Sequence, residues 1–502
     1  MLPALAIGLG ALVIGSAVVA IGWAVVAIVC VALAILLGGA GLVAVAFGER
    51  RASPHRIVLG AAFGLALWSA SFAALLLCGF TSAGARTAKD VALAVLGAVL
   101  WLHAPRARRE DQAGPSGDQP APSEHQPAPS GDQPAPIAGR AAASSSRAPR
   151  WLVVAFAAAC FIATALVVEH VLRFPDGGWD AWMIWNLRAR WIARAGAGFR
   201  TAFSPEIVFW AHQDYPWLVP GAVAQAFLAT GSEAFAIPAA VAWMFAALSV
   251  ALVTLTLGGL RGRVAGLLGG LVLVTTPCFI SFTANQQSDV PMGAMLLLAT
   301  SVLAFALERD EGRLFVLAGA GASMAAWTKN EGSVYGIALV LALFAGGQRK
   351  GAARFIAGAL PGLALLVSFK LLVAHTNDLV HFTSGQTALE RAFDVRRWGE
   401  LYLAWLRRIF YFQNWALWLP AFIAAIALAP KPLPRAPRVL LTALALACAA
   451  YVPMYILQPH PLLWFFRASI DRMFTHLWPS AILAAGLAFR TAPGPARATA
   501  RT

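Results

Sequence analysis

Charged residues are scarce in this chain, and their scarcity excludes an ordinary water-soluble protein. Asp, Glu, Lys and Arg make up only 12% of the 502 residues, whereas 59% are apolar, and the mean hydropathy is +0.70. The apolar residues do not alternate with polar ones as they do in a half-buried helix or strand. They form runs long enough to cross a bilayer, which takes roughly 20 residues. The sequence therefore predicts an all-α, polytopic membrane protein.

Cysteine is also scarce, and its placement argues against a metal site. The five cysteines lie inside apolar runs, none at metal-ligand spacing from another: Cys30, Cys78, Cys160, Cys278 and Cys448. We interpret them as packing residues. Acidic residues are fewer than basic ones, with 23 Asp and Glu against 38 Lys and Arg. Because basic residues between spans orient a membrane protein and meet anionic lipid, we expect membrane lipids as partners and no nucleic acid.

The apolar runs fall into two groups separated by a polar segment. Four runs precede residue 105 and ten follow residue 150, which predicts about fourteen spans. Residues 105–150 contain three Pro-rich heptads, SGDQPAP, SEHQPAP and SGDQPAP, without an apolar face. Such a composition predicts a disordered linker. We therefore expect an N-terminal four-helix unit (1–104), a cytoplasmic linker (105–150), a transmembrane domain (151–490) and a basic cytoplasmic tail (491–502).

Basic segments fix the expected orientation, because positively charged loops stay in the cytoplasm. The clearest are GERRASPHR, HAPRARRE and GGQRKGAAR. Counting spans from them places residues 173–220 on the outer face of an inner or plasma membrane. This stretch is dense in Trp, an aromatic residue that settles at the boundary between membrane and water, and we interpret it as an active-site loop on the bilayer surface. A second outer loop breaks the charge rule with five arginines: Arg391, Arg396, Arg397, Arg407 and Arg408.

The same topology brings acidic and basic residues from distant segments to one face. The acids are Asp180, Asp214, Asp289 and Glu331, and the bases are Lys329, Lys370, Arg467 and Arg472. A carboxylate can take a proton from an acceptor while cations neutralise a leaving phosphate. We therefore predict that the four acids are catalytic and that the four bases bind the phosphate of a lipid-borne donor.

Plainer roles for these residues stay open at this point. Asp180 and Asp289 can cap helices, and Arg472 can pair with its neighbour Asp471. Acids in loops are often only solvated, and lysines at helix ends often extend toward water.

Several motifs, in their order along the chain, resemble membrane glycosyltransferases of the GT-C superfamily. The nearest branch is that of protein O-mannosyltransferases and aminoarabinose transferases, and the resemblance covers residues 151–490. The motifs are GWDAWMIWNLRAR, HQDYPWLVP, TANQQSDVP and AAWTKNEG. The resemblance implies a hexosyl- or pentosyltransferase that uses a polyprenyl-phosphate-linked sugar. It also implies that the active site lies on the outer face, and the acceptor, a lipid, a polysaccharide or a protein, stays open.

Particular positions carry this resemblance. Asp180 occupies the place of the family's catalytic base, and Asp289 that of an acid in the second outer loop. Substrate-binding residues are expected in the aromatic loop and in the motifs HQDYPWLVP and AAWTKNEG: Trp179, Tyr215, Pro216 and Asn330. Many members carry a second acid directly after the base, whereas Ala181 stands there in this chain. The use of a divalent metal is therefore an open question.

A lipid or sugar transporter of the cell envelope is the rival interpretation. Transporters of that kind carry polar residues and broken helices at the bilayer midplane and consist of two related halves. This sequence places its charges at the ends of apolar runs and shows no internal repeat among them. A glycosyltransferase is therefore the favoured prediction.

Overall fold

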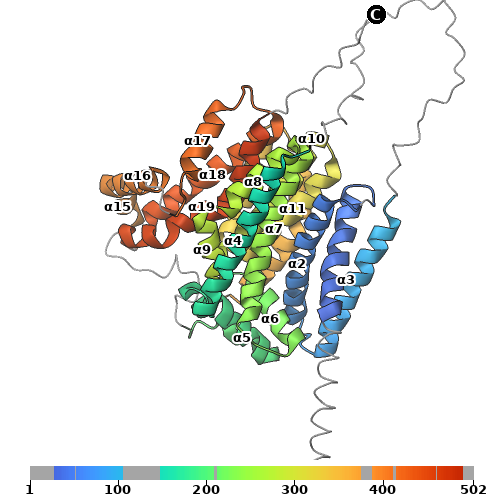
Figure 1. Ribbon diagram of the computed structural model, residues 1–502. Coiled ribbons are helices and arrows are strands. Elements are labelled where there is room, and N and C mark those ends of the chain that lie inside the picture. The colour runs from blue at the N-terminus through green and yellow to red at the C-terminus, as the bar shows by residue number, and fades with distance from the viewer. Residues whose placement is uncertain are drawn as a thin grey trace, which may run out of the picture.

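The computed structural model describes residues 28–50, 52–105, 147–207, 212–374, 387–410, 414–459 and 461–489. Over these residues the chain is helical and contains no strand, which confirms the all-α prediction. Most of the helices run side by side in one bundle, while α15 and α16 lie across its flank (Figure 1). Most of the predicted linker and the whole predicted tail fall outside the described residues, so the domain boundaries stay predictions.

The helices within the described residues fall into three parts of the chain. The N-terminal part holds Ile28–Ala46, α2 (Pro54–Leu77) and α3 (Ala83–His103). The middle part holds α4 (Arg150–Arg173), the π-helix η2 (Ala181–Trp185), α5 (Asn186–Ala195), the 3₁₀-helix η3 (Gly196–Phe203), α6 (Leu218–Thr230), α7 (Ala236–Arg261), α8 (Arg263–Val274), α9 (Pro277–Ala284) and α10 (Asp289–Arg309). The last part holds α11 (Gly312–Thr328), α12 (Glu331–Ala345), α13 (Arg349–Leu372), α15 (Ala388–Phe393), α16 (Val395–Phe410), α17 (Trp418–Leu428), α18 (Arg435–Leu457) and α19 (Leu462–Ala488).

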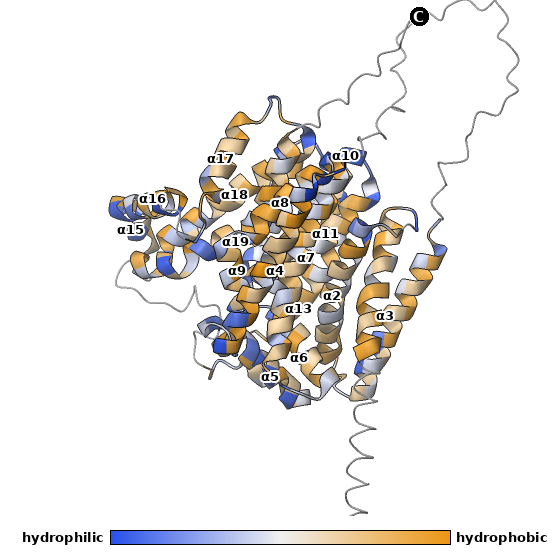
Figure 2. Cartoon of the chain, viewed as in Figure 1, coloured by the Kyte–Doolittle hydropathy of each residue, from blue (hydrophilic) through white to orange (hydrophobic). Residues whose placement is uncertain are grey.

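Seven helices in the described part of the chain are long and apolar enough to cross a membrane: Ile28–Ala46, α2, α4, α7, α10, α13 and α18. The polytopic prediction is confirmed, although the described residues provide fewer such helices than the fourteen runs counted. The helices α11, α12 and α17 have 17, 15 and 11 residues, less than the roughly 20 that a straight crossing requires. Hydrophilic residues gather toward the two ends of the bundle, and hydrophobic ones fill its middle (Figure 2).

One expected span, residues 264–284, is broken. Its two halves, α8 and α9, meet at a 59° bend and form an eighth crossing if counted together. Thr276 is extended at the break and Pro277 opens α9. A residue before proline avoids the helical region, and proline itself has no N–H to continue the helix, so the bend follows from the sequence.

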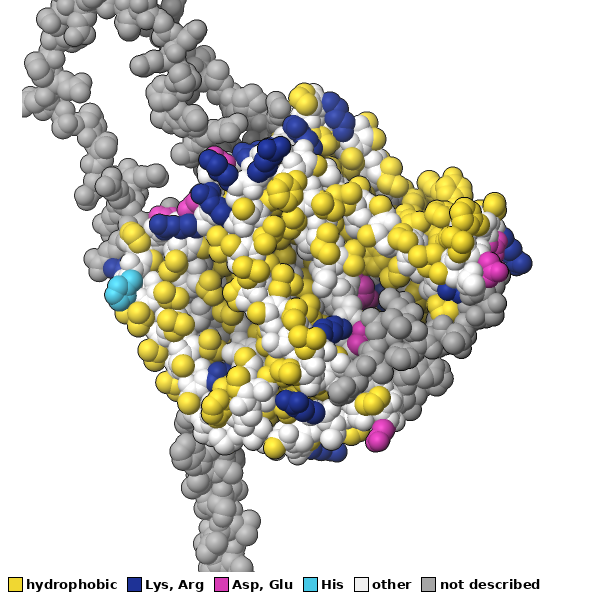
Figure 3. Space-filling view, turned by 180° about the vertical axis from the view of Figure 1, so that it is seen from behind, with side chains coloured by type: hydrophobic (Ala, Val, Ile, Leu, Met, Phe, Trp, Pro, Cys, Tyr) yellow, Lys and Arg dark blue, Asp and Glu magenta, His cyan; other side chains and the backbone are white. Residues whose placement is uncertain are grey.

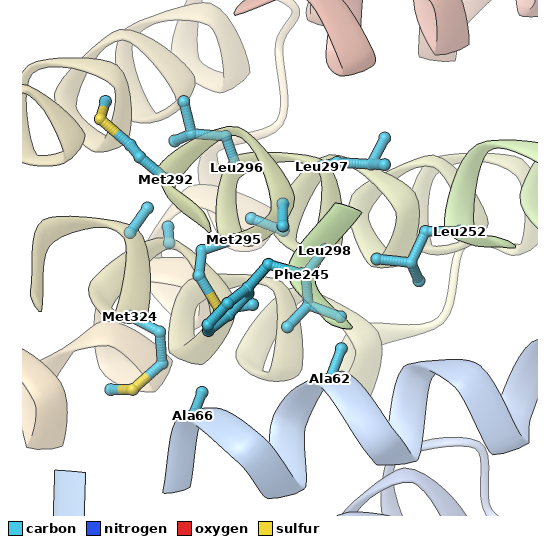
Figure 4. Close-up of a cluster of buried hydrophobic side chains, with 14 of the residues drawn as sticks. Ala62, Ala66, Phe245, Leu252, Met292, Met295, Leu296, Leu297, Leu298 and Met324 are labelled. Atoms are coloured by element: carbon cyan, nitrogen blue, oxygen red, sulfur yellow. The ribbon is translucent and has the colours of Figure 1, made fainter. Parts of the chain in front are cut away.

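Helix α10 forms the centre of the bundle. All its residues from Asp289 to Leu307 are buried, because α2, α7, α11, α18 and α19 surround it. In Figure 4 its Met and Leu side chains meet Phe245 from α7, Met324 from α11 and Ala62 from α2. A helix buried all round has no polar face, which explains why this run shows no helical periodicity. The same contacts place α2 in the main core.

Basic residues collect at one end of the bundle, where α10 ends. Figure 3 shows Lys and Arg side chains gathered there above a largely hydrophobic flank. Several helices begin or end at this side with basic residues: Arg261, Arg263, Arg309, Arg349, Lys350 and Arg435. Two ion pairs join them to acidic neighbours, Arg261 to Glu308 at 2.8 Å and Arg435 to Asp310 at 3.5 Å.

Two of the arginines that depart from the charge rule, Arg391 and Arg397, bind carbonyl oxygens at the end of α18. Arg397 donates to the carbonyl oxygens of Ile456 (2.9 Å) and Gln458 (2.7 Å) at the end of α18. Arg391 donates to Leu457 in the same place, at 2.7 Å. The last carbonyls of a helix lack intrahelical partners, and arginine side chains satisfy them. These cations therefore have a structural reason to lie at the opposite end of the bundle.

Candidate active site

The loop that carries Asp180 is held against the segment after α9. The Gly178 N–H donates to the Asn285 carbonyl at 3.0 Å, and Asn186 Nδ2 donates to Gln286 Oε1 at 2.8 Å. Gly177 has a φ of +77°, and a Cβ there would lie 2.7 Å from the Asn285 oxygen. Only glycine fits this approach. The NQQSD motif thus anchors the first loop with its first residues and supplies Asp289 with its last.

Asp180 faces a cation from the last helix. It immediately precedes η2, caps no helix with its side chain, and its Oδ2 lies 2.7 Å from Arg472 Nη1. Asp471, the sequence neighbour of Arg472, instead contacts Trp415 Nε1 (3.0 Å) and Arg408 (3.2 Å). The helix-cap role for Asp180 and the Asp471 pairing for Arg472 are therefore wrong. A π-helix after Asp180 fits a functional position, since such turns recur there.

Asp289 is the most deeply buried acid of the site. Its Oδ1 accepts from Lys329 Nζ at 2.9 Å and lies 2.6 Å from His476 Nε2. The side chains of Asp289 and Lys329 are only 1% and 2% exposed. Asp289 Oδ2 is buried and finds no partner among the described residues. Lys329 therefore does not extend to water, and Asp289 does more than begin α10.

His476 is a member of this cluster that the sequence analysis missed. Its Nδ1 lies 3.3 Å from the Tyr451 hydroxyl, so it links α18 to Asp289 on α10. The available signal was its position, because an ionisable residue within an apolar helix usually marks a site. Two other anchors, Asn186 and Gln286, had no such signal, because polar residues are ordinary in a surface loop.

Lys329 extends the cluster toward Tyr215. Its Nζ lies 3.4 Å from Glu331 Oε1, and the Tyr215 hydroxyl donates to the same oxygen at 3.3 Å. Burial favours the neutral amine, but Asp289 and Glu331 outweigh it and raise the pKa of Lys329 above its ordinary value. Burial and the nearby carboxylates of Glu331 and Asp214 hold the pKa of Tyr215 well above its ordinary range. Lys329 therefore stays charged and Tyr215 stays neutral.

Asp214 forms a second, more open group. Its Oδ2 accepts from Asn330 Nδ2 at 2.7 Å and lies 3.3 Å from Lys370 Nζ. Lys370 also donates to Asn330 Oδ1 at 2.9 Å and to the Asp214 carbonyl. The Lys370 side chain is 32% exposed. The structure thus brings together all four predicted acids and three of the four predicted bases.

The remaining predicted residues lie at the edge of this site. Arg467 is exposed on α19, and among the described residues no contact joins it to the cluster. Trp179 is 48% exposed and meets Trp182 edge-on at 6.2 Å. Pro216 is buried and offers no polar side chain. The grouping of Arg467 with the other bases is therefore not supported by the geometry.

The family comparison matches the part of the chain that holds most of this site. Residues 215–374 match the family of dolichyl-phosphate-mannose-protein mannosyltransferases. This chain is a membrane glycosyltransferase of the GT-C type. No curated protein and no solved structure matches it.

The matched segment of this glycosyltransferase begins at Tyr215 and includes Asp289, Lys329 and Lys370. Asp180 and Arg472 lie outside it, and only their contacts bring them to the site. Within the described parts of the chain, no three His, Cys, Asp or Glu side chains are arranged to hold a metal ion.

Proposed function

We propose that this glycosyltransferase moves a sugar from a polyprenyl-phosphate-linked donor to an acceptor at the outer face of an inner or plasma membrane. The observation that supports this most directly is the acid and base cluster at the end of the bundle away from the basic helix ends. Since basic segments face the cytoplasm, the cluster faces outward. A lipid-linked donor presents its phosphate at this depth, because its head group stays at the interface.

Asp180 is the residue to which we assign the general base. Arg472 contacts its Oδ2, and we assign Oδ1 to the acceptor. Asp180 removes the acceptor hydroxyl proton while the acceptor oxygen bonds to the anomeric carbon of the sugar. The bond from that carbon to the donor phosphate breaks, and the polyprenyl phosphate leaves with inversion. A positioned base contributes typically about 10²- to 10⁴-fold to such a rate.

The cations divide into two kinds in this proposal. Lys370 and Arg472 have side chains 32% and 25% exposed, so they can turn toward a phosphate. Lys329 is enclosed by Asp289 and Glu331, and its role is to hold those two acids. Arg467 receives no role in phosphate binding.

Substrate recognition is assigned to the groups that border Asp214. Trp179 presents an exposed ring on which a sugar face can stack. Tyr215 stacks on Trp185 with 5.6 Å between ring centroids, which fixes its hydroxyl beside Glu331. Asn330 joins Asp214 to Lys370, and its amide suits hydrogen bonding to sugar hydroxyls.

A lateral cavity supports a lipid-borne donor. It has a volume of about 350 Å³ and lies between α4, α7, α8 and α9. Its lining is apolar, with Phe156 and Thr254 at one end and Val167 and Thr283 at the other. Thr283 lies two residues before Asn285, the anchor of the Asp180 loop. An apolar chain in this cavity would therefore end beside the site.

The experiment is mass spectrometry of the lipids that co-purify with wild type and Asp180→Asn. We expect a polyprenyl-phosphate sugar to accumulate on the variant, and the mass of that sugar distinguishes a hexose from a pentose. The matched control is Asp176→Asn, an exposed carboxylate on the same loop. If all three forms carried only bulk phospholipid, the assignment of a polyprenyl-phosphate donor would be wrong and the transporter interpretation would be favoured.

A further inference from the structure

A buried ion pair lies in the N-terminal unit, far outside the matched segment. On α3 the Lys89 ammonium and the Asp90 carboxylate are 2.8 Å apart, with side chains 6% and 11% exposed. A charged residue inside an apolar helix of a membrane protein is costly and usually has a function. Neither residue contacts the acid and base cluster described above, so the pair needs a separate explanation.

The pair belongs to a closed ring of hydrogen bonds that joins three helices. Lys89 Nζ donates to Gln225 Oε1 on α6. Gln225 Nε2 then donates to the Trp68 carbonyl on α2 at 3.0 Å. Trp68 Nε1 donates to Asp90 Oδ1 at 3.0 Å, which closes the ring. Because every member finds a partner, the ring fixes the position of α6 against α2 and α3.

A second contact holds the other end of α6. Ser69 Oγ donates to the Leu218 carbonyl at 2.6 Å, at the first residue of the helix. A Cβ on Gly221 would lie 2.8 Å from that hydroxyl, so the two helices meet closely only because this residue is glycine. Ser69 and Gln225 thus fix α6 at two points, one near its start and one in its second half.

The start of α6 is rigidly joined to the candidate active site. Leu218 comes four residues after Asp214 and three after Tyr215. Between them Trp217 is fully buried and stacks on Phe199 at 5.5 Å. The Gly221 N–H donates to the Trp217 carbonyl at 2.7 Å. A displacement of α6 therefore moves Asp214 and Tyr215 with it.

We propose that the N-terminal unit is a positioning element of the glycosyltransferase, in which Ser69 and Lys89, through Leu218 and Gln225 of α6, clamp that helix and so place Asp214 and Tyr215. None of Ser69, Lys89 and Gln225 touches the reacting groups. A misplacement of about 1 Å is enough to cost about 100-fold in rate. This inference depends on the proposed function only for its kinetic test, because the hydrogen-exchange test does not require sugar transfer.

The first test measures hydrogen exchange of residues 212–217 by mass spectrometry in wild type, Ser69→Ala and Gln225→Leu. We expect faster exchange of this segment in both variants and unchanged exchange in α10. The control is Thr87→Ala, which removes an exposed hydroxyl from α3. Unchanged exchange of residues 212–217 in both variants would overturn the proposal, whatever reaction the protein catalyses.

The second test measures transfer from the proposed donor. We expect kcat to fall about tenfold or more in Gln225→Leu with little change in KM, because positioning is lost while the donor site remains. Gln225→Glu keeps the acceptor for Lys89 but loses the donor to the Trp68 carbonyl, so it should recover only part of the rate. An unchanged kcat in Gln225→Leu would contradict the clamp. Absence of transfer by wild type would instead contradict the proposed function and leave the exchange test decisive.

A cross-link covers the case in which these variants do not fold. The background is a chain whose five natural cysteines are replaced by alanine and whose residues 106–146 contain a protease site. In this background, Ser69→Cys with Gly221→Cys places two thiols at disulfide distance. After cleavage, the two fragments should migrate together until a reductant is added. Gly84→Cys with Gly221→Cys is the control, since Gly84 has no neighbour within 4 Å. Equal cross-linking in the two pairs, or none in the first, would overturn the contact.

Discussion

Two acid and base pairs of the candidate site differ in how far they lie from solvent. Asp289 and Lys329 are 1% and 2% exposed, whereas Asp214 and Lys370 are 7% and 32% exposed. The buried pair has additional partners in His476 and Glu331 and has no freedom to exchange them. The open pair can release one partner to a substrate. The comparison supports our proposal that the buried pair holds the site together and that Lys370 of the open pair binds the donor phosphate.

The largest effect on stability should come from breaking the buried pair. Asp289→Leu leaves the buried Lys329 with Glu331, at 3.4 Å, as its remaining acidic partner, and breaking a buried pair costs up to about 3 to 5 kcal/mol of unfolding free energy. Lys329→Met added to Asp289→Leu should recover part of that loss, because the buried ammonium is removed while Glu331 keeps the Tyr215 hydroxyl as a partner. Thermal unfolding of the purified protein measures both. Equal midpoints for wild type and the single variant would contradict a holding role for this pair.

A smaller effect, on substrate binding rather than on stability, should follow from the open pair. Lys370→Met removes the charge-assisted hydrogen bond that we propose to the donor phosphate, which would be worth about 1.5 to 3 kcal/mol, or roughly 10- to 150-fold in the KM for the donor. The unfolding midpoint should barely change, because Asn330 still binds Asp214. Arg467→Met is the control, and we expect its KM to equal that of wild type. A larger KM for the Arg467 variant than for the Lys370 variant would reverse the assignment of the cations.

The Tyr215 hydroxyl donates to Glu331, which is a partner of the buried pair. Tyr215→Phe removes the bond to Glu331 and keeps the stacking on Trp185, so we expect a loss of about 1 kcal/mol of stability. Tyr402→Phe, on the exposed side of α16, is the matched control. Chemical unfolding of the two variants in parallel gives the difference, and an equal effect of both would mean that the Tyr215 hydroxyl adds nothing.

The smallest effect concerns pH. The pKa of Lys329 is raised, so its stabilising charge is fully present below its ordinary pKa of about 10.4 and is lost only as the pH rises past the raised value. The difference in unfolding midpoint between wild type and Lys329→Met should therefore stay constant between about pH 7 and pH 9. A difference that shrinks over this range would show that Lys329 loses its proton there.

The candidate site was predictable in part from span counting. Once basic segments fixed the orientation, Asp180, Asp214, Asp289 and Glu331 fell on one face, and the structure brings them together. Counting spans does not tell which side chains meet, because that depends on how each helix is rotated against its neighbours. Arg472 therefore pairs with Asp180 from a distant loop, while the adjacent Asp471 turns to Arg408.

The sequence by itself determined that this protein is a helical membrane protein. Long apolar runs leave backbone groups no water to bond with, so each run satisfies its own hydrogen bonds as a helix. Proline and glycine further determined local features, such as the bend before Pro277 and the close approach at Gly177. Tertiary structure alone decided that His476 supports Asp289, that α10 lies at the centre, and that the N-terminal unit packs on α6. The contacts of His476 with Asp289 and of the N-terminal unit with α6 join residues more than a hundred positions apart, and local periodicity carries no information about which distant faces meet.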